Sequence, residues 1–285
     1  MDWMKVLIRL FWVSRPILWL NTIGPAFIGL WLTGHLWDPK MLPILIWLGL
    51  PFNLLIYGTN DISDREVDAI SERKGLFEGT VLANREVGIV ASAVFLTNVP
   101  FFIYFSFWLP SSALWAMLAY IAVFMGYSVT PFRFKARPIL DSISNAAYAF
   151  PLWFVPLALE STPNYLALFS LMTWSMAKHT FDSIQDIEED RICKLNTTAV
   201  TFGLKFALGW SAFWWMIATT LLIFINPYIA AVVFLGSAFL VGALYKTPTP
   251  KKAHDLYRYS IGYPYIAGTI AGVSLALTVW QGQLL

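Results

Sequence analysis

Charged residues are scarce in this chain. Only 13% of its 285 residues are charged, whereas 58% are hydrophobic, and the formal net charge is +2. This composition excludes an ordinary soluble domain, and so small a net charge gives no reason to expect a nucleic-acid partner. Cysteine is nearly absent too: Cys193 stands alone, so no disulfide can form within the chain. No small-residue cleavage site follows residues 1–15, so we expect this stretch to be retained rather than removed as a signal peptide.

Apolar runs dominate instead. Nine stretches come close to the ~20 residues that a helix needs to cross a bilayer. They fall at 16–34, 41–60, 87–108, 110–130, 139–159, 164–185, 203–225, 227–245 and 260–281. The pattern predicts an all-α polytopic membrane protein with about nine transmembrane helices around a central cavity. No linker or low-complexity segment divides the chain, so residues 1–285 are expected to form a single transmembrane domain.

Lysine and arginine alternate between the loops that these spans would create. All but two of the 19 basic residues fall in the N-terminal segment or in the second, fourth, sixth and eighth loops, and Lys40 and Lys178 are the exceptions. Positive charge collects in cytoplasmic loops. The distribution therefore predicts a cytoplasmic N-terminus and an outer C-terminus, in a protein of the cell (plasma) membrane.

Two acidic clusters interrupt the apolar sequence, and their ligand-type residues recur every four positions. They are Asn60, Asp64 and Asp68 in the first cluster and Asp182, Asp186 and Asp190 in the second. A step of four would place each trio on one face of a single helix. Mg²⁺ takes oxygen ligands, typically one or two carboxylates together with substrate phosphates. Both clusters fall on the predicted cytoplasmic side, so we expect them to meet over one cavity and to hold Mg²⁺ against a diphosphate. The alternative is that acids simply mark loops that face water.

Basic residues in the same loops are candidates for binding the remaining diphosphate oxygens. They are Arg73, Lys74, Lys135 and Arg137. Arginine and lysine both bind phosphate, arginine through its planar fork and lysine as a point charge. The alternative for each is membrane topology alone, which already accounts for basic residues in these loops.

An ionising prenyl diphosphate would leave a carbocation, which aromatic ring faces can stabilise. Tyr57 and Tyr127 lie near the cytoplasmic ends of their expected spans and are candidates for that role. Aromatic residues also form interfacial belts, which is the alternative reading. For His179 we expect a structural hydrogen bond, and for Asp141 an ion pair with Arg137, rather than catalytic roles.

Both clusters resemble known motifs. The run Asn60-Asp61-x-x-Asp64-x-x-x-Asp68, with Arg73 following, and the run Asp186-x-x-x-Asp190, with Thr198 and Gly203 following, are similar to the two diagnostic motifs of the UbiA superfamily of intramembrane prenyltransferases. The resemblance covers nearly the whole chain. It implies Mg²⁺-dependent transfer of a prenyl group from its diphosphate to a lipophilic acceptor, with catalytic roles for Asp64, Asp68, Asp186 and Asp190.

Further segments resemble one branch of that superfamily, the lycopene elongases that make fifty-carbon carotenoids. These segments are Ser14-Arg15-Pro16, Tyr57-Gly58, Arg73-Lys74-Gly75-x-x-Glu78-Gly79 and Arg133-x-Lys135-x-Arg137-Pro138-x-x-Asp141. The branch implies dimethylallyl diphosphate as donor and lycopene as acceptor, with water or proton loss quenching the final cation. Asp182 is not shared by every member of the family, which leaves its metal role less secure.

Other functions share parts of this sequence pattern. A UbiA-type enzyme acting on an aromatic quinone precursor usually carries an Asn-Arg-Pro-type segment after the first motif, where this chain has residues 76–79, Leu-Phe-Glu-Gly. A glycerol phosphate ether lipid is another possible acceptor. CDP-alcohol phosphotransferases need an Asp-Gly and Ala-Arg arrangement that is absent here. A cation transporter would place its carboxylates near the bilayer midplane, whereas both clusters are expected at one surface.

Overall fold

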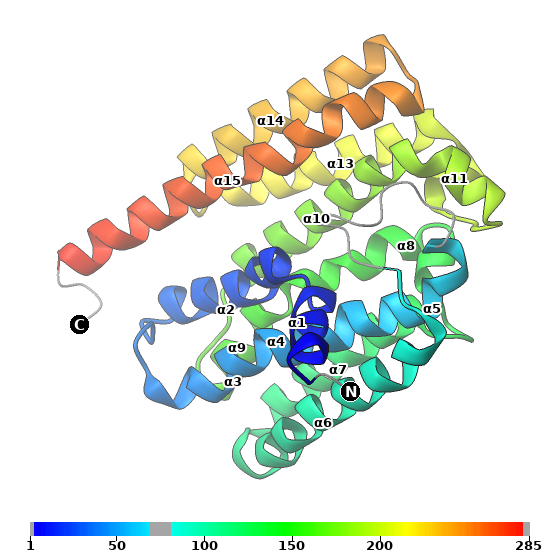
Figure 1. Cartoon of the computed structure of the whole chain (residues 1–285). Coiled ribbons are helices and arrows are strands. Elements are labelled where there is room, and N and C mark those ends of the chain that lie inside the picture. Colours follow the sequence, from blue (N-terminus) through cyan, green and yellow to red (C-terminus); the bar gives the residue numbers. More distant parts are fainter. Residues whose placement is uncertain (1–2, 69–80, 282–285) are drawn as a thin grey trace. The chain divides into compact units, whose positions relative to one another are not determined.

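The computed structural model describes residues 3–68 and 81–281, and within those ranges the secondary structure is helical, with no strand (Figure 1). The predicted all-α class is confirmed. The chain divides into two compact units. Unit 1 comprises residues 1–133 and 150–163, and unit 2 comprises residues 134–149 and 164–285.

Unit 1 packs its helices around buried aromatic rings. Its elements are α1 (Trp3–Val13), η1 (Pro16–Trp19), α2 (Leu20–Leu32), η2 (Pro39–Met41), α3 (Leu42–Leu48), α4 (Leu50–Asn53), the π-helical η3 (Leu54–Gly58), α5 (Thr59–Asp68), α6 (Asn84–Trp108), α7 (Ser111–Ser128) and α9 (Pro151–Ala158). The Phe52 ring centroid lies 4.6 Å from that of Trp47 and 4.5 Å from that of Tyr120. Ring pairs at such separations contribute about 0.5–1.5 kcal/mol beyond burial of area. The cluster therefore helps to fix how α3, α4 and α7 meet.

A buried asparagine adds a polar contact to this core. Trp47 Nε1 donates to Asn98 Oδ1 at 3.0 Å, and Asn98 Nδ2 donates to the Pro51 carbonyl oxygen at 2.8 Å. Asn98 is 1% exposed. Polar groups are buried at low cost only when they are hydrogen-bonded, so Asn98 ties α6 to the segment around α3 and α4.

Unit 2 is a bundle of long antiparallel helices with short segments at one end. Its elements are η4 (Phe134–Ala136), α8 (Leu140–Ile143), η5 (Ser144–Ala149), α10 (Tyr165–Asp182), η6 (Ser183–Asp186), α11 (Ile187–Ile192), α12 (Thr198–Phe202), α13 (Leu204–Ile223), α14 (Pro227–Lys246) and α15 (Pro250–Trp280). Figure 1 shows α13, α14 and α15 side by side, and α10 packs extensively on α13. At one crossing, a Cβ added to Gly236 of α14 would lie 2.6 Å from the Tyr263 ring of α15. The missing side chain is what allows this close approach.

The described residues contain six helical segments that are long and apolar enough to cross a membrane. They are Pro39–Arg65, Asn84–Trp108, Ser111–Ser128, Leu204–Ile223, Pro227–Lys246 and Pro250–Leu277, and the bent pair Trp3–Val13 and Pro16–Leu32 would make a seventh. The sequence predicted about nine, and that count is not confirmed. Expected span 139–159 is divided among α8, η5 and α9, and α10 carries Lys178, His179 and Asp182 near its end.

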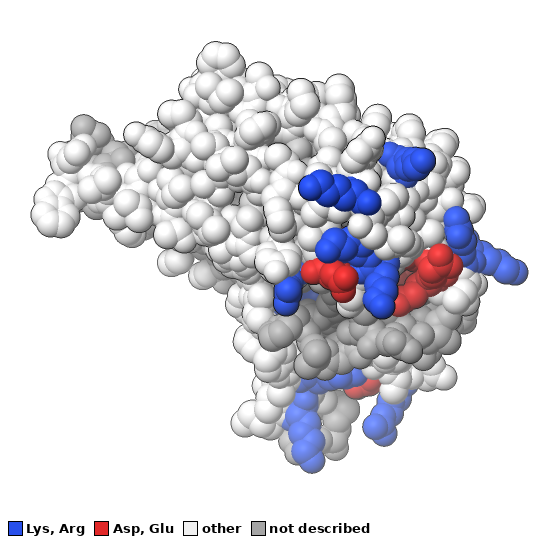
Figure 2. Space-filling view, turned by 90° about the horizontal axis from the view of Figure 1, so that it is seen from above, with Lys and Arg blue, Asp and Glu red and all other residues white. Residues whose placement is uncertain are grey.

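The outer surface of unit 2 is apolar along its helices and charged at one end. Only 11% of the most apolar stretch of α15 is buried in the protein, and Ile266, Val273 and Leu277 of this helix are exposed. The lysines stand at helix ends, with Lys205 near the start of α13 and Lys246 at the end of α14. Figure 2 shows charged side chains gathered at one end of the face drawn, with uncharged flanks. An apolar surface of this extent matches lipid rather than water.

Candidate active site

The first acidic cluster lies on α5, directly after the π-helical turn η3. Because α5 is one continuous helix, Asn60 and Asp64 lie one turn apart on the same face, as the sequence predicted. Ser128 Oγ donates to Asn60 Oδ1 at 3.2 Å, and Arg133 Nη2 approaches Asp64 Oδ1 at 3.4 Å. The side chain of Asp68 lies outside the described residues. Single π-helical turns occur often at functional sites, and here one precedes the candidate ligands.

A buried arginine beside this cluster was not recognised from the sequence. Arg15 Nη2 lies 2.7 Å from Asp61 Oδ1, with 13% of the arginine side chain and none of the aspartate side chain exposed. The guanidinium carbon also stands 4.6 Å from the centre of the Tyr57 ring. From the sequence, Arg15 was counted among the basic residues of the N-terminal segment and named in a segment that resembles the lycopene elongases, without a contact partner. The sequence did contain one relevant feature. Asp61 is one position after Asn60, so on a helix its side chain points away from the candidate metal face, towards the protein interior.

The contact with Arg15 bears on the role expected for Tyr57, the stabilisation of a carbocation. Its side chain is only 6% exposed, and one ring face is occupied by Arg15. The ring therefore stabilises a cation that belongs to the protein. Tyr127, the other tyrosine named from the sequence, lies in the last turn of α7, next to Ser128.

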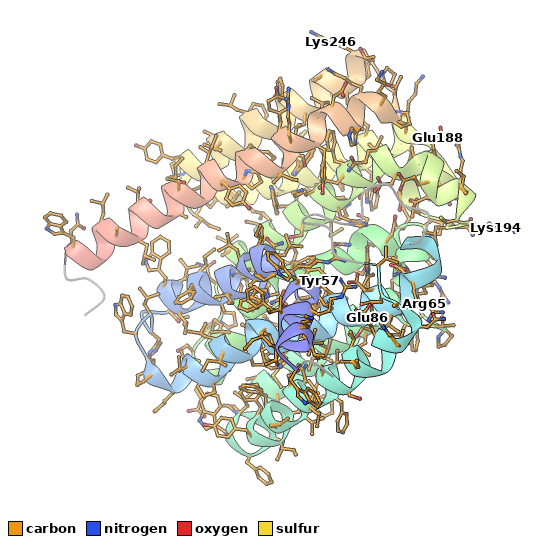
Figure 3. The ribbon with its side chains drawn as sticks, in the orientation of Figure 1. Tyr57, Arg65, Glu86, Glu188, Lys194 and Lys246 are labelled. Carbon is orange, nitrogen blue, oxygen red and sulfur yellow. The ribbon has the colours of Figure 1, made fainter. Side chains whose placement is uncertain are left out.

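A second ion pair of unit 1 connects α1 to the start of α6. Arg9 Nε donates to Glu86 Oε1 at 3.0 Å, and Arg9 Nη2 donates to Glu86 Oε2 at 3.1 Å. The side chains are 33% and 24% exposed. Glu86 also accepts from the Ala83 amide at 2.8 Å, so it caps the first turn of α6. Figure 3 labels Glu86 together with Tyr57 and Arg65 in unit 1.

The second acidic cluster differs from the expected single helix. Asp182 ends α10, residues Ser183–Asp186 form the 3₁₀ turn η6, and Asp190 lies in α11. At about three residues per turn, four residues of 3₁₀ helix rotate a side chain by roughly 120°, against about 40° in an α-helix. Asp182 is therefore rotated away from the face that Asp186 occupies.

The contacts of Asp182 agree with that rotation. Lys178 Nζ donates to Asp182 Oδ2, and Ser260 Oγ donates to Asp182 Oδ1 at 2.5 Å. Ser260 lies on α15, so one oxygen of Asp182 joins α10 to α15 while the other binds Lys178 of α10 itself. Asp190 accepts instead from Thr197 Oγ1 at 3.2 Å, and Thr197 caps the N-terminus of α12.

Two of the four candidate diphosphate-binding residues, Lys135 and Arg137, lie in the part of the chain that the structure describes. Lys135, in η4, is 8% exposed, and Arg137 is the first residue after η4. Arg73 and Lys74 lie outside the described residues. Asp141 was expected to pair with Arg137, and its carboxylate accepts hydrogen bonds from Thr198, at 2.8 Å from the amide to Oδ2 and also from Oγ1 to Oδ1.

Charged side chains lie at one end of unit 2, near α11 and the end of α14. Figure 3 labels Glu188 of α11 together with Lys194 and Lys246, and all three lie at the same end of this unit. Glu188 is largely exposed and stands 3.9 Å from Arg191. The first cluster belongs to unit 1 and the second to unit 2, and the expectation that they meet over one cavity stays a prediction.

Comparison with known proteins decides the family. The sequence profile described as the UbiA prenyltransferase family matches residues 22–280. The chain belongs to this family. A lycopene elongase/hydratase of Halobacterium salinarum is 34% identical over 216 residues, which is 73% of this chain and 76% of the relative. A lycopene elongase/hydratase of Haloarcula japonica is 32% identical over 211 residues, 72% of this chain and 71% of the relative.

A solved structure supports the same fold. The UbiA homolog from Archaeoglobus fulgidus bound to DMAPP and Mg²⁺ superimposes with a TM-score of 0.67 at 16% identity, covering 93% of this chain and 99% of the other. At that identity the likeness concerns the fold. The apolar helices and the family together make this UbiA prenyltransferase an integral membrane protein.

The described residues of this UbiA prenyltransferase suit Mg²⁺ by the chemistry of their donors. Asn60 and Asp64 in the first cluster, and Asp186 and Asp190 in the second, carry hard oxygen donors, the kind that Mg²⁺ prefers. Among the described residues no three His, Cys, Asp or Glu side chains gather as a metal site. Mg²⁺ in proteins typically binds one or two carboxylates and completes its shell with substrate phosphate and water. Asp182 fits less well, because both its oxygens are already engaged.

Proposed function

We propose that this UbiA prenyltransferase transfers a dimethylallyl group from its diphosphate to lycopene, in a Mg²⁺-dependent step of carotenoid biosynthesis. The observation that carries the proposal is the presence of two oxygen-ligand clusters in a chain that is 34% identical to a lycopene elongase/hydratase. The Mg²⁺ and DMAPP named for the Archaeoglobus fulgidus homolog support the donor class.

The proposed site uses both clusters. Asn60, Asp64 and Asp68 act from one side and Asp186 and Asp190 from the other, with the smaller role falling to Asp182. Mg²⁺ held by these residues would supply positive charge to neutralise the departing diphosphate. The remaining phosphate oxygens are bound by the basic residues of the two loops, namely Arg73, Lys74, Lys135 and Arg137.

The proposed reaction breaks and forms one bond at the same prenyl carbon. The C–O bond to the diphosphate breaks, and the leaving group departs with the electron pair. The terminal double bond of lycopene then attacks the allylic cation, forming a C–C bond. Water addition or proton loss quenches the resulting cation. The protein must therefore keep stray nucleophiles away from the first cation, which a site inside an apolar helical bundle favours.

In the same proposal residues 1–285 act as one prenyltransferase domain, and the match of the family to residues 22–280, which span both units, supports this. The chain crosses the plasma membrane about nine times, with the N-terminus inside and the C-terminus outside. Both acidic clusters then lie on the cytoplasmic side, where a water-soluble diphosphate has access. The alternation of basic loops supports this orientation.

The first test is pigment analysis by liquid chromatography and mass spectrometry in lycopene-accumulating bacteria that express the chain. We expect products heavier by one or two five-carbon units with the unaltered protein, and none with Asp64→Ala or Asp186→Ala. Glu188→Ala is the matched control, since Glu188 is an exposed acid beside the second cluster and its loss should leave the products unchanged.

Two outcomes would contradict parts of the proposal. Unchanged lycopene in cells that contain well-folded protein would remove lycopene as acceptor and direct the search to quinone precursors and glycerol phosphate ether lipids. Full activity of either aspartate variant would contradict the assignment of the clusters to Mg²⁺. Membrane yield and melting behaviour of each variant separate loss of activity from loss of fold.

A further inference from the structure

Two adjacent threonines at the start of α12 bind different parts of the candidate site. Thr197, at the N-cap of α12, donates from Oγ1 to Asp190 Oδ2 at 3.2 Å. Thr198 donates from its amide to Asp141 Oδ2 at 2.8 Å and from Oγ1 to Asp141 Oδ1. Thr197 is 6% exposed and Thr198 is fully buried. One dipeptide thus contacts a candidate metal ligand and a carboxylate of another segment.

Thr198 also receives a hydrogen bond from the segment that it holds. The Ile139 amide donates to Thr198 Oγ1 at 2.7 Å. Ile139 has a φ of +70°, a backbone conformation that a β-branched residue rarely adopts and that persists only when its surroundings impose it. The contact with Thr198 is one such constraint.

The segment fixed in this way carries the candidate diphosphate-binding residues. Lys135 and Arg137 come just before Ile139, and the Asp141 amide donates to the Arg137 carbonyl oxygen at 3.0 Å. Asp141 is 1% exposed, and a buried carboxylate is stable only when donors satisfy it. Hydrogen bonds to a charged acceptor are short and strong, so the Thr198–Asp141 contact anchors the basic loop firmly.

We infer that Thr197 and Thr198 are positioning residues for prenyl transfer, an inference that rests on the proposed function. Thr197 orients Asp190 for the metal, and Thr198, through Asp141, holds the loop with Lys135 and Arg137 for the diphosphate. The two threonines are adjacent at the start of α12, so together they fix the position of Asp190 relative to the segment that carries Lys135 and Arg137. Partners of this kind orient a ligand without touching the substrate, and their loss typically costs about 10–100-fold in affinity or activity.

Loss of each hydroxyl should change a different kinetic quantity, the Mg²⁺ requirement for Thr197 and the KM for prenyl diphosphate for Thr198. Valine replaces threonine with nearly the same shape and removes only the hydroxyl. Thr197→Val should raise the Mg²⁺ concentration for half-maximal activity about tenfold or more, with the KM for prenyl diphosphate little changed at saturating Mg²⁺. Thr198→Val should raise the KM for prenyl diphosphate by a similar factor, while the Mg²⁺ requirement at saturating donor stays close to that of the unaltered protein.

Conservative variants test the chemistry of each contact. Thr197→Ser and Thr198→Ser keep the hydroxyl, so each should recover most of the loss seen with valine. Thr201→Val is the matched control, because Thr201 lies in the same short helix and is exposed. It should behave like the unaltered protein in both assays.

A binding measurement provides a readout that does not depend on turnover. The melting temperature of the detergent-solubilised protein is followed by tryptophan fluorescence, with and without Mg²⁺ and inorganic pyrophosphate. The unaltered protein and both serine variants should be stabilised by the two probes together. Thr198→Val should lose most of this stabilisation at a pyrophosphate concentration near half-saturation, and Thr197→Val should recover it when Mg²⁺ is raised.

The outcomes distinguish this inference from the proposed function. Wild-type kinetics and stabilisation in both valine variants would overturn the inference alone. An unaltered protein that neither transfers prenyl groups nor responds to the probes would overturn the proposed function and the inference with it. If Thr198→Val does not fold, the Mg²⁺ dependence of Thr197→Val still decides, because that change leaves the Thr198 side chain itself unaltered.

Discussion

The buried ion pair between Arg15 and Asp61 makes a quantitative prediction about stability. Replacing Arg15 by methionine keeps an unbranched side chain and leaves Asp61, none of whose side chain is exposed, without its 2.7 Å partner. Removing one member of a buried pair costs about 3–5 kcal/mol, because the remaining charge stays desolvated. Arg15→Met should therefore lower the free energy of unfolding by about that amount.

The pair between Arg9 and Glu86 supplies the matched control. Its side chains are 33% and 24% exposed, and such pairs contribute about 0–1 kcal/mol. Arg9→Met should therefore have a small effect. Both variants can be measured by equilibrium unfolding in mixed micelles with increasing dodecyl sulfate, followed through the fluorescence of the 14 tryptophans.

A double variant tests the reasoning more sharply. Arg15→Met combined with Asp61→Leu removes both charges, and apolar replacement of a buried pair is often neutral or stabilising. Most of the lost stability should return. The argument is refuted if Arg15→Met costs no more than Arg9→Met, or if the double variant is less stable than Arg15→Met alone.

Three further predictions concern packing and metal. Gly236→Ala should lower the free energy of unfolding by about 1–3 kcal/mol, since the new methyl group would meet the Tyr263 ring at 2.6 Å. Gly242→Ala, on the same helix with open space around it, should be neutral or stabilise by up to about 1 kcal/mol. Unfolding in mixed micelles compares the two variants, and equal effects would argue against the α14–α15 contact. Asn98→Ala should cost about 1–3 kcal/mol because it leaves the Trp47 indole N–H unpaired, and a Trp47→Phe background should reduce that cost. Treatment with EDTA should abolish prenyl transfer and added Mg²⁺ should restore it, and activity that survives chelation would contradict metal dependence.

The sequence predicted the helical class and the shared helix face of Asn60 and Asp64 because both depend on local periodicity. Apolar runs of membrane length and a four-residue step on α5 require no knowledge of distant partners. The second cluster shows where such reasoning fails. A 3₁₀ turn between Asp182 and Asp186 has the same residue spacing as an α-helix in the sequence, yet it sends the two carboxylates in different directions.

Contacts between segments that are distant in the chain could not be predicted from the sequence either. Arg15 lies 46 positions from Asp61, and Thr198 lies 57 positions from Asp141, so neither pairing is visible in a local pattern. Arg15 looked like one more basic residue of a cytoplasmic segment. What sets it apart is burial against a carboxylate and a ring, which only the folded chain supplies.

The pairing of Lys178 with Asp182 bears on how the protein enters the membrane. In the proposed arrangement α10 crosses the bilayer with Lys178 and Asp182 near its end. A lone lysine or aspartate opposes insertion by about 2.5–3.5 kcal/mol at the centre of a helix, and that figure is an upper bound for these two residues. The two residues are four positions apart and bind each other within α10. Each charge is therefore neutralised by a residue of the same helix, without any other helix. Ser260, which completes the contact, is made 78 residues later than Asp182. Insertion of α10 therefore does not have to wait for α15, and the last helix of the chain only locks a segment that is already in place.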